Sequence, residues 1–369
     1  MSYEIAFVIE DVLGHITHGD NLRSHVPDDP EVSAHWVTLP FDAPGRASRL
    51  PGYRSNWTVR SGVMARRELR RIEREQPLDV VFFHTQVPAM LRPRWLSKVP
   101  IVISVDATPR QYDELGSFYQ HDVGPAAIER LKLRVTRARF AEATHIVAWS
   151  AWAKQGLVDE YGVPADKVTV IPPGVDVAEW SEPARPAVRP GPVRILFVGG
   201  DLERKGGLVL IEAFRSLRDL DVELHLVTRD DVETAPGIHV HRGLRPNSDE
   251  LRALYRHADV FTLPTFGDCL PMVLSEAGAA ALPTVSTDVA AIPEIVLDDV
   301  TGLLVPPGDV TALADALRRL VTRGDERVQF GSRAASHVAE HFDTATNTAR
   351  LLDVVKDAAD RTPTRRTTR

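Results

Sequence analysis

The sequence is poor in cysteine, in excess positive charge and in long hydrophobic runs. Its single cysteine, Cys269, excludes a disulfide framework and is typical of proteins in reducing compartments. With 44 basic and 51 acidic side chains the formal net charge is −7, which argues against nucleic-acid binding through bulk charge. No apolar run approaches the roughly 18 residues of a membrane span, and the N-terminal MSYEIAFVIE lacks the features of a signal peptide. We therefore expect a cytoplasmic protein that does not bind nucleic acid.

An apolar content of 43% is sufficient for substantial hydrophobic cores, and 369 residues suggest two domains. Strand-like runs alternate with helix-like ones, the pattern typical of parallel α/β sheets. In the first half, β-branched apolar runs predict strands buried on both faces at 3–10, 79–84, 100–106, 144–150 and 167–172. In the second half, strands are predicted at 193–200, 223–228, 238–244, 259–265, 283–288 and 302–307. Further helices are predicted at 206–218, 309–322, 325–341 and 345–359.

Residues 181–192, SEPARPAVRPGP, are rich in proline and small residues and show no periodicity, which predicts a linker. We expect two tandem Rossmann-like domains, each a doubly wound parallel sheet, at 1–180 and 193–345. The remaining residues, 346–369, are expected to form a helix that packs back on the N-terminal domain, followed by a tail. Doubly wound sheets bind ligands at the carboxyl ends of their strands, so a site is expected in one cleft that both domains face.

The segment FVGGDLERKGG (197–207) combines a strand, a glycine-rich loop and the start of a helix. Gly199 and Gly200 allow close backbone approach, the helix start offers unpaired N–H groups, and Arg204 and Lys205 add two cations. This pattern predicts an anion site. The spacing fits neither GxGxxG nor GxxxxGK[ST], which excludes the dinucleotide and P-loop motifs. An ordinary glycine-rich turn with solvated charges is the alternative.

The segment GDCLPMVLSE places two carboxylates, Asp268 and Glu276, around an apolar run. Pro271 suits the first position of a helix, and the N–H groups of Leu270 and Met272 would then point toward the cleft. A glycosidase needs two carboxyl groups on opposite sides of the scissile bond, about 5–10 Å apart. Two groups on one loop and helix approach a ligand from the same side. We therefore predict a clamp on hydroxyl groups rather than a hydrolase pair.

Five segments in this order resemble the family 4 retaining glycosyltransferases, which have a GT-B fold. They are THIVAWSAWAKQGLVDEYGVPADKVTVIPPGVD, FVGGDLERKGG, RALYRHADVFTLPT, DCLPMVLSEAGAAALPTVSTDVAAIPEIV and TGLLVPPGD. The resemblance is dense from about residue 143 to 310 and thin before that. It implies a retaining hexosyltransferase that uses a nucleoside diphosphate sugar as its substrate, with no cofactor. We also expect no need for a metal, because Lys205 and Arg204 would supply the cations at the diphosphate.

The resemblance also implies roles for individual residues. Glu276 would hold the ribose hydroxyls, Asp268 would face the hydroxyls of the transferred sugar, and Lys205 with Arg204 would neutralise the diphosphate. His84, at the end of DVVFFH, matches a histidine of the family that reaches the donor sugar and the acceptor side. The other donor-binding candidates are Gly199, Gly200, Leu244, Leu270, Pro271 and Met272. The acceptor-side candidates are Gly14, His15 and Asp106.

Some of these residues have a plain structural alternative or depart from the family pattern. A histidine on an apolar strand, such as His84, is more often a core residue whose hydrogen bonds are satisfied. Asp268 is one methylene shorter than the usual glutamate, and Asp106 stands near a position that is often histidine. Gly200 stands where many members carry a phosphate-binding arginine, which Arg204 would have to replace. The loop VLGHITHGDNLR (12–23) lacks the frequent Gly-Gly pair.

Residues 60–75, RSGVMARRELRRIERE, predict a helix whose narrow apolar stripe, Ala65, Leu69 and Ile72, docks it on its domain. Six arginines gather on the opposite face: Arg60, Arg66, Arg67, Arg70, Arg71 and Arg74. A second basic run lies at 130–140. One interpretation is an acceptor that is anionic or lipid-linked, with peripheral contact at the inner face of a membrane. The other is a solvated arginine face on an acidic protein.

Two rival functions stay open. A GT-B sugar-nucleotide epimerase would share the donor site and need no acceptor, and an inactive GT-B scaffold would bind partners instead. The D-x-D of Asp219 and Asp221 falls on a helix-to-strand turn away from the expected cleft, so we expect no metal site there.

Overall fold

The computed structural model describes residues 2–11, 15–41, 56–91, 94–116, 125–181, 187, 189–233 and 235–361. Within these residues the chain divides into two compact units. Unit 1 takes in the described parts of Met1–Gln111, Asp122–Pro173 and Thr344–Arg369, and unit 2 those of Tyr112–His121 and Gly174–Asp343. Gly14, half of the predicted linker (182–186 and 188) and the tail from residue 362 lie outside the described residues.

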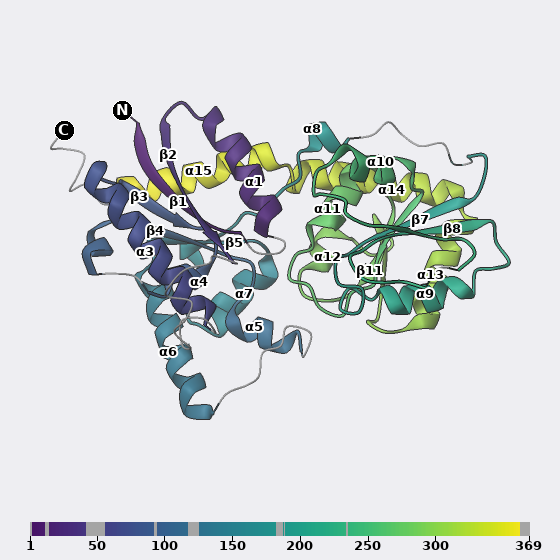
Figure 1. The fold of residues 1–369 in the computed structure, drawn as a ribbon, viewed down its shortest axis with the longest axis horizontal. Helices are drawn as coiled ribbons and strands as arrows, with labels where there is room; N and C mark the ends of the chain where they lie inside the picture. Colours follow the sequence, from purple (N-terminus) through teal and green to yellow (C-terminus); the bar gives the residue numbers. More distant parts are fainter. Residues whose placement is uncertain are drawn as a thin grey trace. The chain divides into compact units, whose positions relative to one another are not determined.

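Unit 1 is built on a six-stranded parallel sheet in the order β2-β1-β3-β4-β5-β6 (Figure 1). Its strands are β1 (Tyr3–Asp11), β2 (Val32–Pro40), β3 (Val80–Phe83), β4 (Ile101–Val105), β5 (His145–Ala148) and β6 (Val168–Val170). The five strands that the sequence predicts for this half are confirmed, whereas β2 was not predicted. As an edge strand, β2 buries only Val37 and Leu39 completely, so it lacks the continuous apolar run of a strand that is covered on both faces.

Helices cover both faces of this sheet. They are α1 (His15–His25), α3 (Trp57–Glu75), α4 (Gln86–Ala89), α5 (Pro109–Glu114, which continues into unit 2), α6 (Ala126–Glu142), α7 (Ala151–Asp159) and α15 (Thr344–Asp360). Short 3₁₀ turns lie at Val26–Asp28, Arg94–Lys98 and Ala165–Lys167. Buried side chains of α3, α6 and α7 share one core with Val81 and Phe83, while those of α1 and α15 share the other with Phe7 and Phe82. Residues 12–23 are expected from the sequence to form a loop. That expectation is wrong in part, because α1 begins at His15.

Unit 2 repeats the plan with a parallel sheet in the order β12-β11-β10-β7-β8-β9. Its strands are β7 (Val193–Val198), β8 (Val222–Val227), β9 (Ile238–His241), β10 (Val260–Leu263), β11 (Thr284–Thr287) and β12 (Gly302–Val305). All six match predicted strands. Its helices are α8 (Val177–Trp180), α9 (Gly207–Arg215), α10 (Asp249–His257), α11 (Met272–Ala279), α12 (Ile292–Ile295), α13 (Val310–Thr322) and α14 (Gly324–His341). The sequence thus codes for two Rossmann-like sheets.

The strand orders locate one switch point in each sheet. In unit 1 the order turns around between β1 and β3, and in unit 2 it turns around between β7 and β10. The connections that leave two such neighbouring strands run to opposite sides of the sheet and open a crevice at the carboxyl ends. The residues that follow these four strands are therefore the first places to look for a binding site.

Candidate functional site

At the switch point of unit 2, the loops that follow β7 and β10 bring two cations to one carboxylate. Lys205 forms an ion pair with Asp268. Arg204 donates from Nη1 to the Gly267 carbonyl at 2.8 Å, and the same nitrogen lies 3.6 Å from Asp268 Oδ1. Thr265 donates to Asp268 Oδ2 at 3.3 Å. The structure thus joins three of the predicted catalytic residues in one polar cluster, in which Asp268 is buried and the two cations are half-buried. The cluster also includes a buried threonine that the sequence did not single out.

The backbone of the first loop explains how this contact is held. Gly206 has φ +74°, and a Cβ at that position would lie 1.9 Å from the carbonyl oxygen of Pro264, so only glycine fits. The turn before it is fixed by Asp201, whose Oδ1 accepts from the Arg204 backbone N–H at 3.0 Å. The close approach at Gly206 brings the two loops together. Lys205 stands next to it and reaches Asp268 from there.

A third cation, Arg229, lies against the same glycine-rich loop. It lies two residues after the end of β8, and its Nε donates to the carbonyl oxygen of Gly200 at 3.3 Å. A Cβ at Gly200 would lie 2.9 Å from this Nε. Arg229 therefore brings an exposed guanidinium to the position where an arginine was expected from the resemblance and a glycine stands. The sequence contained one signal for it, because Arg229 comes just after a predicted strand at the same edge of the sheet.

Glu276 lies in α11, which begins at Met272 with Pro271 as its N-cap, one residue later than predicted. The residue is 5% exposed, and Tyr255 of α10 donates to its Oε2 at 2.7 Å. Burial raises the pKa of Glu276 to about 7, an effect that the hydrogen bond from Tyr255 partly opposes. The pKa of Tyr255 is raised as well, first by burial and then by the charge of Glu276. Tyr255 was not a candidate, since in the sequence it reads as part of the apolar face of α10.

The remaining donor-binding candidates surround these residues in unit 2. Gly199, Leu270 and Pro271 are buried, and Gly200 and Met272 are half-buried beside them at the ends of the two loops. Leu244 is half-buried and follows β9, whose last residue is His241. Their roles in holding a nucleotide sugar stay predictions.

At the switch point of unit 1, the first residue after β3 is His84, which is fully buried. Its ring lies 4.8 Å from that of His18 and 5.3 Å from that of His15, measured between centroids, and 5.8 Å from that of Trp149. Neither ring nitrogen of His84 has a hydrogen-bond partner within the part of the chain that the structure describes. His84 therefore does not fit the alternative of a core histidine whose hydrogen bonds are satisfied by its neighbours.

Burial, more than any neighbouring charge, keeps the His84 ring neutral. Burial lowers its pKa well below the ordinary value, and the neighbouring His18 and His15 lower it further. Burial and the nearby His15 also lower the pKa of His18 to about 3. His15 Nε2 lies 3.6 Å from Asp106 Oδ2, so the acceptor-side candidates His15 and Asp106 meet beside His84.

Three more polar or aromatic residues complete this cluster. His18 lies one turn after His15 on α1, and Trp149, after β5, contacts all three histidine rings and donates to Ser104 at 2.7 Å. Glu10 of β1 accepts hydrogen bonds from Thr85 and from Trp57, and burial raises its pKa. The sequence did not single out these three residues. The repeat of histidine at a spacing of three, as in HITH, was the available signal for His18.

The arginine surface of unit 1 lies on α3. Ala65, Leu69 and Ile72 are buried as predicted, whereas five arginines are exposed: Arg66, Arg67, Arg70, Arg71 and Arg74. They line a surface hollow of about 650 Å³. Arg60 does not belong to this surface, contrary to the sequence interpretation, because its guanidinium lies over the Phe41 and Trp57 rings. None of the described helices has both the length and the apolar character needed to cross a membrane.

Comparison with known proteins gives consistent matches over both units. A family model described as Glycosyltransferase Family 4 matches residues 22–179, and one described as Glycosyl transferases group 1 matches residues 192–323. A D-inositol 3-phosphate glycosyltransferase of Pseudarthrobacter chlorophenolicus is 31% identical over 360 residues, which cover 90% of this chain and 82% of the relative. Further relatives with the same name match this chain over 49% to 60% of their own lengths.

Two solved structures share the architecture at low sequence identity. Sucrose-phosphate synthase from Thermosynechococcus elongatus has a TM-score of 0.76 at 16% identity, over 96% of this chain and 98% of that one. Anabaena Alr3699/HepE in complex with UDP-glucose has a TM-score of 0.70 at 14% identity, over 96% of this chain and 99% of that one. The fold is therefore that of the GT-B proteins, with two Rossmann-like domains.

Proposed function

This chain belongs to the family 4 glycosyltransferases, and from that premise we propose that it transfers a hexose from a nucleoside diphosphate sugar to an acceptor hydroxyl with retention at the anomeric carbon. The observation that carries the proposal is the contact of Arg204 and Lys205 with Asp268 at the switch point of unit 2. Cell-surface polysaccharide, glycolipid or glycoconjugate synthesis is the proposed setting. The names of two matched relatives, a colanic acid and an amylovoran biosynthesis glycosyltransferase, support that setting.

In the proposed reaction the bond between the anomeric carbon and the diphosphate breaks as an oxocarbenium-like centre develops. Negative charge then grows on the leaving diphosphate, and stabilising that charge is the main task of the protein. Lys205, Arg204 and Arg229 supply three cations around the glycine-rich loop, and the adjacent start of α9 supplies backbone N–H groups. With these cations in place, the reaction needs no divalent metal ion. Asp268 would bind hydroxyl groups of the sugar while remaining close to Lys205.

Glu276 is proposed to bind the ribose. Among the described residues, Tyr255 is the one side chain that donates to its carboxylate, through Oε2. The other carboxylate oxygen is then available for ribose hydroxyls, which are hydrogen-bond donors. A charged acceptor forms stronger hydrogen bonds than a neutral one, so donor binding should favour the ionised form of Glu276. The complexes of HepE with UDP and with UDP-glucose support a nucleoside diphosphate hexose as the donor.

The histidine cluster of unit 1 is proposed to bind sugar and acceptor hydroxyls. A neutral imidazole can both donate and accept a hydrogen bond, and the two buried nitrogens of His84 are unpaired among the described residues. The site residues include no side chain placed as an obvious nucleophile. We therefore favour attack on the same face that the diphosphate leaves, with a phosphate oxygen taking the proton of the acceptor hydroxyl.

An anionic or lipid-linked acceptor is the proposed partner of the arginine surface on α3. The name of the inositol 3-phosphate relative supports an acceptor that carries phosphate. A second feature supports a lipid surface. On α6, Ile128 is 48% and Leu131 is 60% exposed, and this helix carries the second basic run. Exposed apolar side chains flanked by arginine and lysine are typical of helices that lie at a membrane interface.

Co-sedimentation with liposomes containing anionic lipid tests this contact. We expect binding that weakens as salt is raised, and loss of binding when three arginines of α3, Arg67, Arg70 and Arg71, become glutamine. The charge-matched control replaces three exposed arginines of unit 2, Arg215, Arg218 and Arg333. No sedimentation at low salt, or equal loss in both triple variants, would leave the arginines of α3 as a solvated surface.

The transferase function is tested by incubating the protein with common nucleotide sugars, first alone and then with candidate acceptors. A thermal-shift screen selects the donor, because a bound ligand stabilises the folded protein by mass action. We expect release of nucleoside diphosphate that depends on the acceptor, and a product with the donor's anomeric configuration by NMR. Conversion of the sugar without an acceptor would instead identify an epimerase. Failure to bind any nucleoside diphosphate in calorimetry would favour a scaffold.

A further inference from the structure

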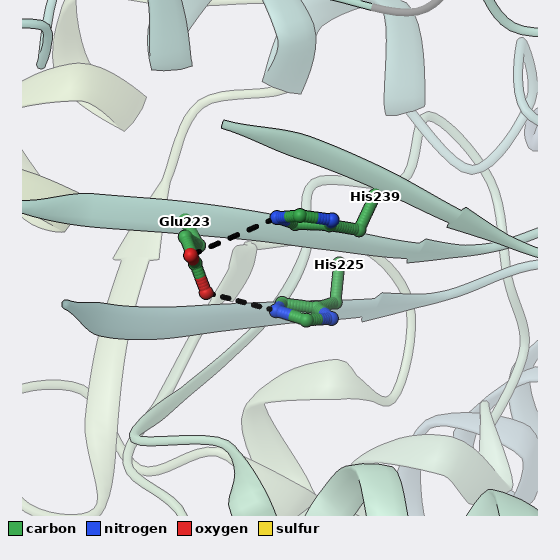
Figure 2. Close-up of side chains that lie close together, drawn as sticks. All are labelled: Glu223, His225 and His239. Atoms are coloured by element: carbon green, nitrogen blue, oxygen red, sulfur yellow. Dashed lines mark ion pairs between the residues drawn. The ribbon is translucent and has the colours of Figure 1, made fainter. Parts of the chain in front are cut away.

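Two strands at the edge of the unit 2 sheet present a cluster of metal-ligand side chains on one face (Figure 2). Glu223 and His225 lie two positions apart on β8, and His239 is the cross-strand partner of His225 on β9. Because side chains alternate along a strand, residues two apart share a face, and directly paired residues on neighbouring parallel strands lie side by side. One ligand atom from each of the three residues lies within 4.8 Å of the other two.

The separations in this cluster are close to those around a bound ion. Glu223 Oε2 lies 3.5 Å from His225 Nε2, and Glu223 Oε1 lies 3.8 Å from His239 Nε2. Zn²⁺ binds imidazole nitrogen and carboxylate oxygen at about 2.0–2.2 Å, so ligand atoms of a tetrahedral site lie about 3.3–3.5 Å apart. Small side-chain rotations are sufficient to close the difference, and the two histidine rings already stack with centroids 4.8 Å apart.

A further residue, His241 of β9, orients His225. The Nδ1 atom of His225 lies 3.0 Å from Nε2 of His241, which is a hydrogen-bond distance. Nε2 of His225 is buried and has no hydrogen-bond partner among the described residues, and it faces the Glu223 carboxylate. In metal sites, the ring nitrogen of a histidine that does not bind the metal usually forms a hydrogen bond, and this bond fixes the orientation of the ring.

The plain alternative is that Glu223 serves as an ion-pair partner of Arg194 on β7. Their side chains lie 3.7 Å apart, beyond hydrogen-bond distance, and are 35% and 31% exposed. Exposed pairs of this kind contribute little to stability, so Arg194 does not compete strongly for the carboxylate. Beside the cluster, a cavity of about 320 Å³ that Glu223 and His225 help to line has room for a water molecule as fourth ligand.

We propose that Glu223, His225 and His239 bind one divalent transition-metal ion, with Zn²⁺ as the best fit, and that His241 holds His225 in the binding orientation. Two imidazoles and one carboxylate suit Zn²⁺, Co²⁺, Ni²⁺ or Cu²⁺, whereas Mg²⁺ prefers an all-oxygen environment. The site lies on a face of the sheet and not in the loops after β7 and β10. It therefore ties the edge strand β9 to β8 and takes no part in the transfer reaction.

Calorimetric titration of the chelator-treated full chain with ZnCl₂ tests the proposal. We expect one Zn²⁺ per chain with a micromolar or tighter Kd, a rise in Tm on binding, and no response to MgCl₂. The spectrum of the Co²⁺ form should report a site of low coordination number. Absence of saturable Zn²⁺ binding by the wild-type protein would overturn the proposal without reference to any variant.

The variants assign the site. His225→Gln and His239→Gln should each weaken Zn²⁺ binding at least 100-fold, and His241→Ala should weaken it about 10- to 100-fold, as is usual for an outer support. The matched control is His35→Gln, which removes a histidine that lies 2.8 Å from Glu4 across β1 and β2 and has no third ligand beside it among the described residues. Its Zn²⁺ binding should equal that of the wild type. Because His239 is 48% exposed, His239→Gln is expected to fold, and unchanged stoichiometric binding in that variant would refute the assignment.

Discussion

Replacing Glu276 by glutamine is expected to stabilise the ligand-free protein at alkaline pH while impairing its use of the donor. Burial raises the pKa of Glu276 from 4.5 to about 7. In the unfolded chain the carboxyl group returns to its ordinary pKa. Between these two pH values the folded state therefore holds a proton that the unfolded state has already released. As a consequence, the free energy of unfolding decreases as the pH rises through this window.

The size of the effect follows from the difference between the two pKa values. At about 1.4 kcal/mol per pKa unit, it corresponds to roughly 3 kcal/mol. This stability is fully present below about pH 4.5, and it is lost by the time the pH has risen through about 7. Glutamine has nearly the same shape, stays neutral and still accepts the hydrogen bond from Tyr255. The variant should therefore match the wild type near pH 4 and exceed its stability by roughly 3 kcal/mol near pH 8.

Urea unfolding at several pH values, followed by circular dichroism, measures this difference. The quantity to compare is the difference in the free energy of unfolding between the variant and the wild type at each pH. All other titrating groups are common to both proteins, so their contributions cancel in this difference. Glu203→Gln, which removes an exposed carboxylate in the β7–α9 loop, serves as the control and should follow the wild-type profile. Parallel profiles for Glu276→Gln and the wild type would refute the reasoning, since they would mean that the buried carboxyl group titrates as it does in water.

Further expectations concern the donor site itself. Glu276→Gln and Lys205→Ala should each lower donor turnover about 10- to 150-fold, because each removes a charged hydrogen bond that contributes roughly 1.5–3 kcal/mol. Asp268→Asn should impair turnover of the nucleotide sugar more than binding of the free nucleoside diphosphate by calorimetry; equal losses would mean that Asp268 contacts the nucleotide. Arg229→Ala should weaken nucleoside diphosphate binding about tenfold, an effect that raised salt should reduce in the wild type; unchanged affinity would leave Arg204 and Lys205 as the cations of the site. Excess chelator should leave turnover unchanged while lowering the Tm of Zn²⁺-loaded protein, and a loss of turnover that magnesium restores would contradict the metal-free mechanism.

The strand pattern and the two loop motifs could be predicted because each depends on neighbouring residues in the chain. Buried parallel strands read as continuous apolar runs, and Lys205 and Asp268 each follow such a run. Which residues meet across the sheet depends on the strand order, which the sequence pattern does not supply. Arg229 reaches Gly200 only because β8 lies beside β7, and Tyr255 reaches Glu276 only because α10 and α11 pack in the same unit. A half-buried edge strand such as β2 lacks the continuous run and was missed for that reason.

The packing of α15 within unit 1 has a consequence for synthesis on the ribosome. The side chains of Leu351, Leu352 and Val355 complete the core that Phe7 and Phe82 begin. About 170 residues, those of 174–343, separate α15 from the preceding part of unit 1. At roughly 5–20 residues per second, one face of the first sheet waits for about 10–30 s before its covering helix is made. The second unit, most of which is encoded in one continuous stretch, can fold during that wait. The half of the protein that is translated first is thus the one that is finished last, and during the interval its uncovered apolar face is a natural target for chaperones.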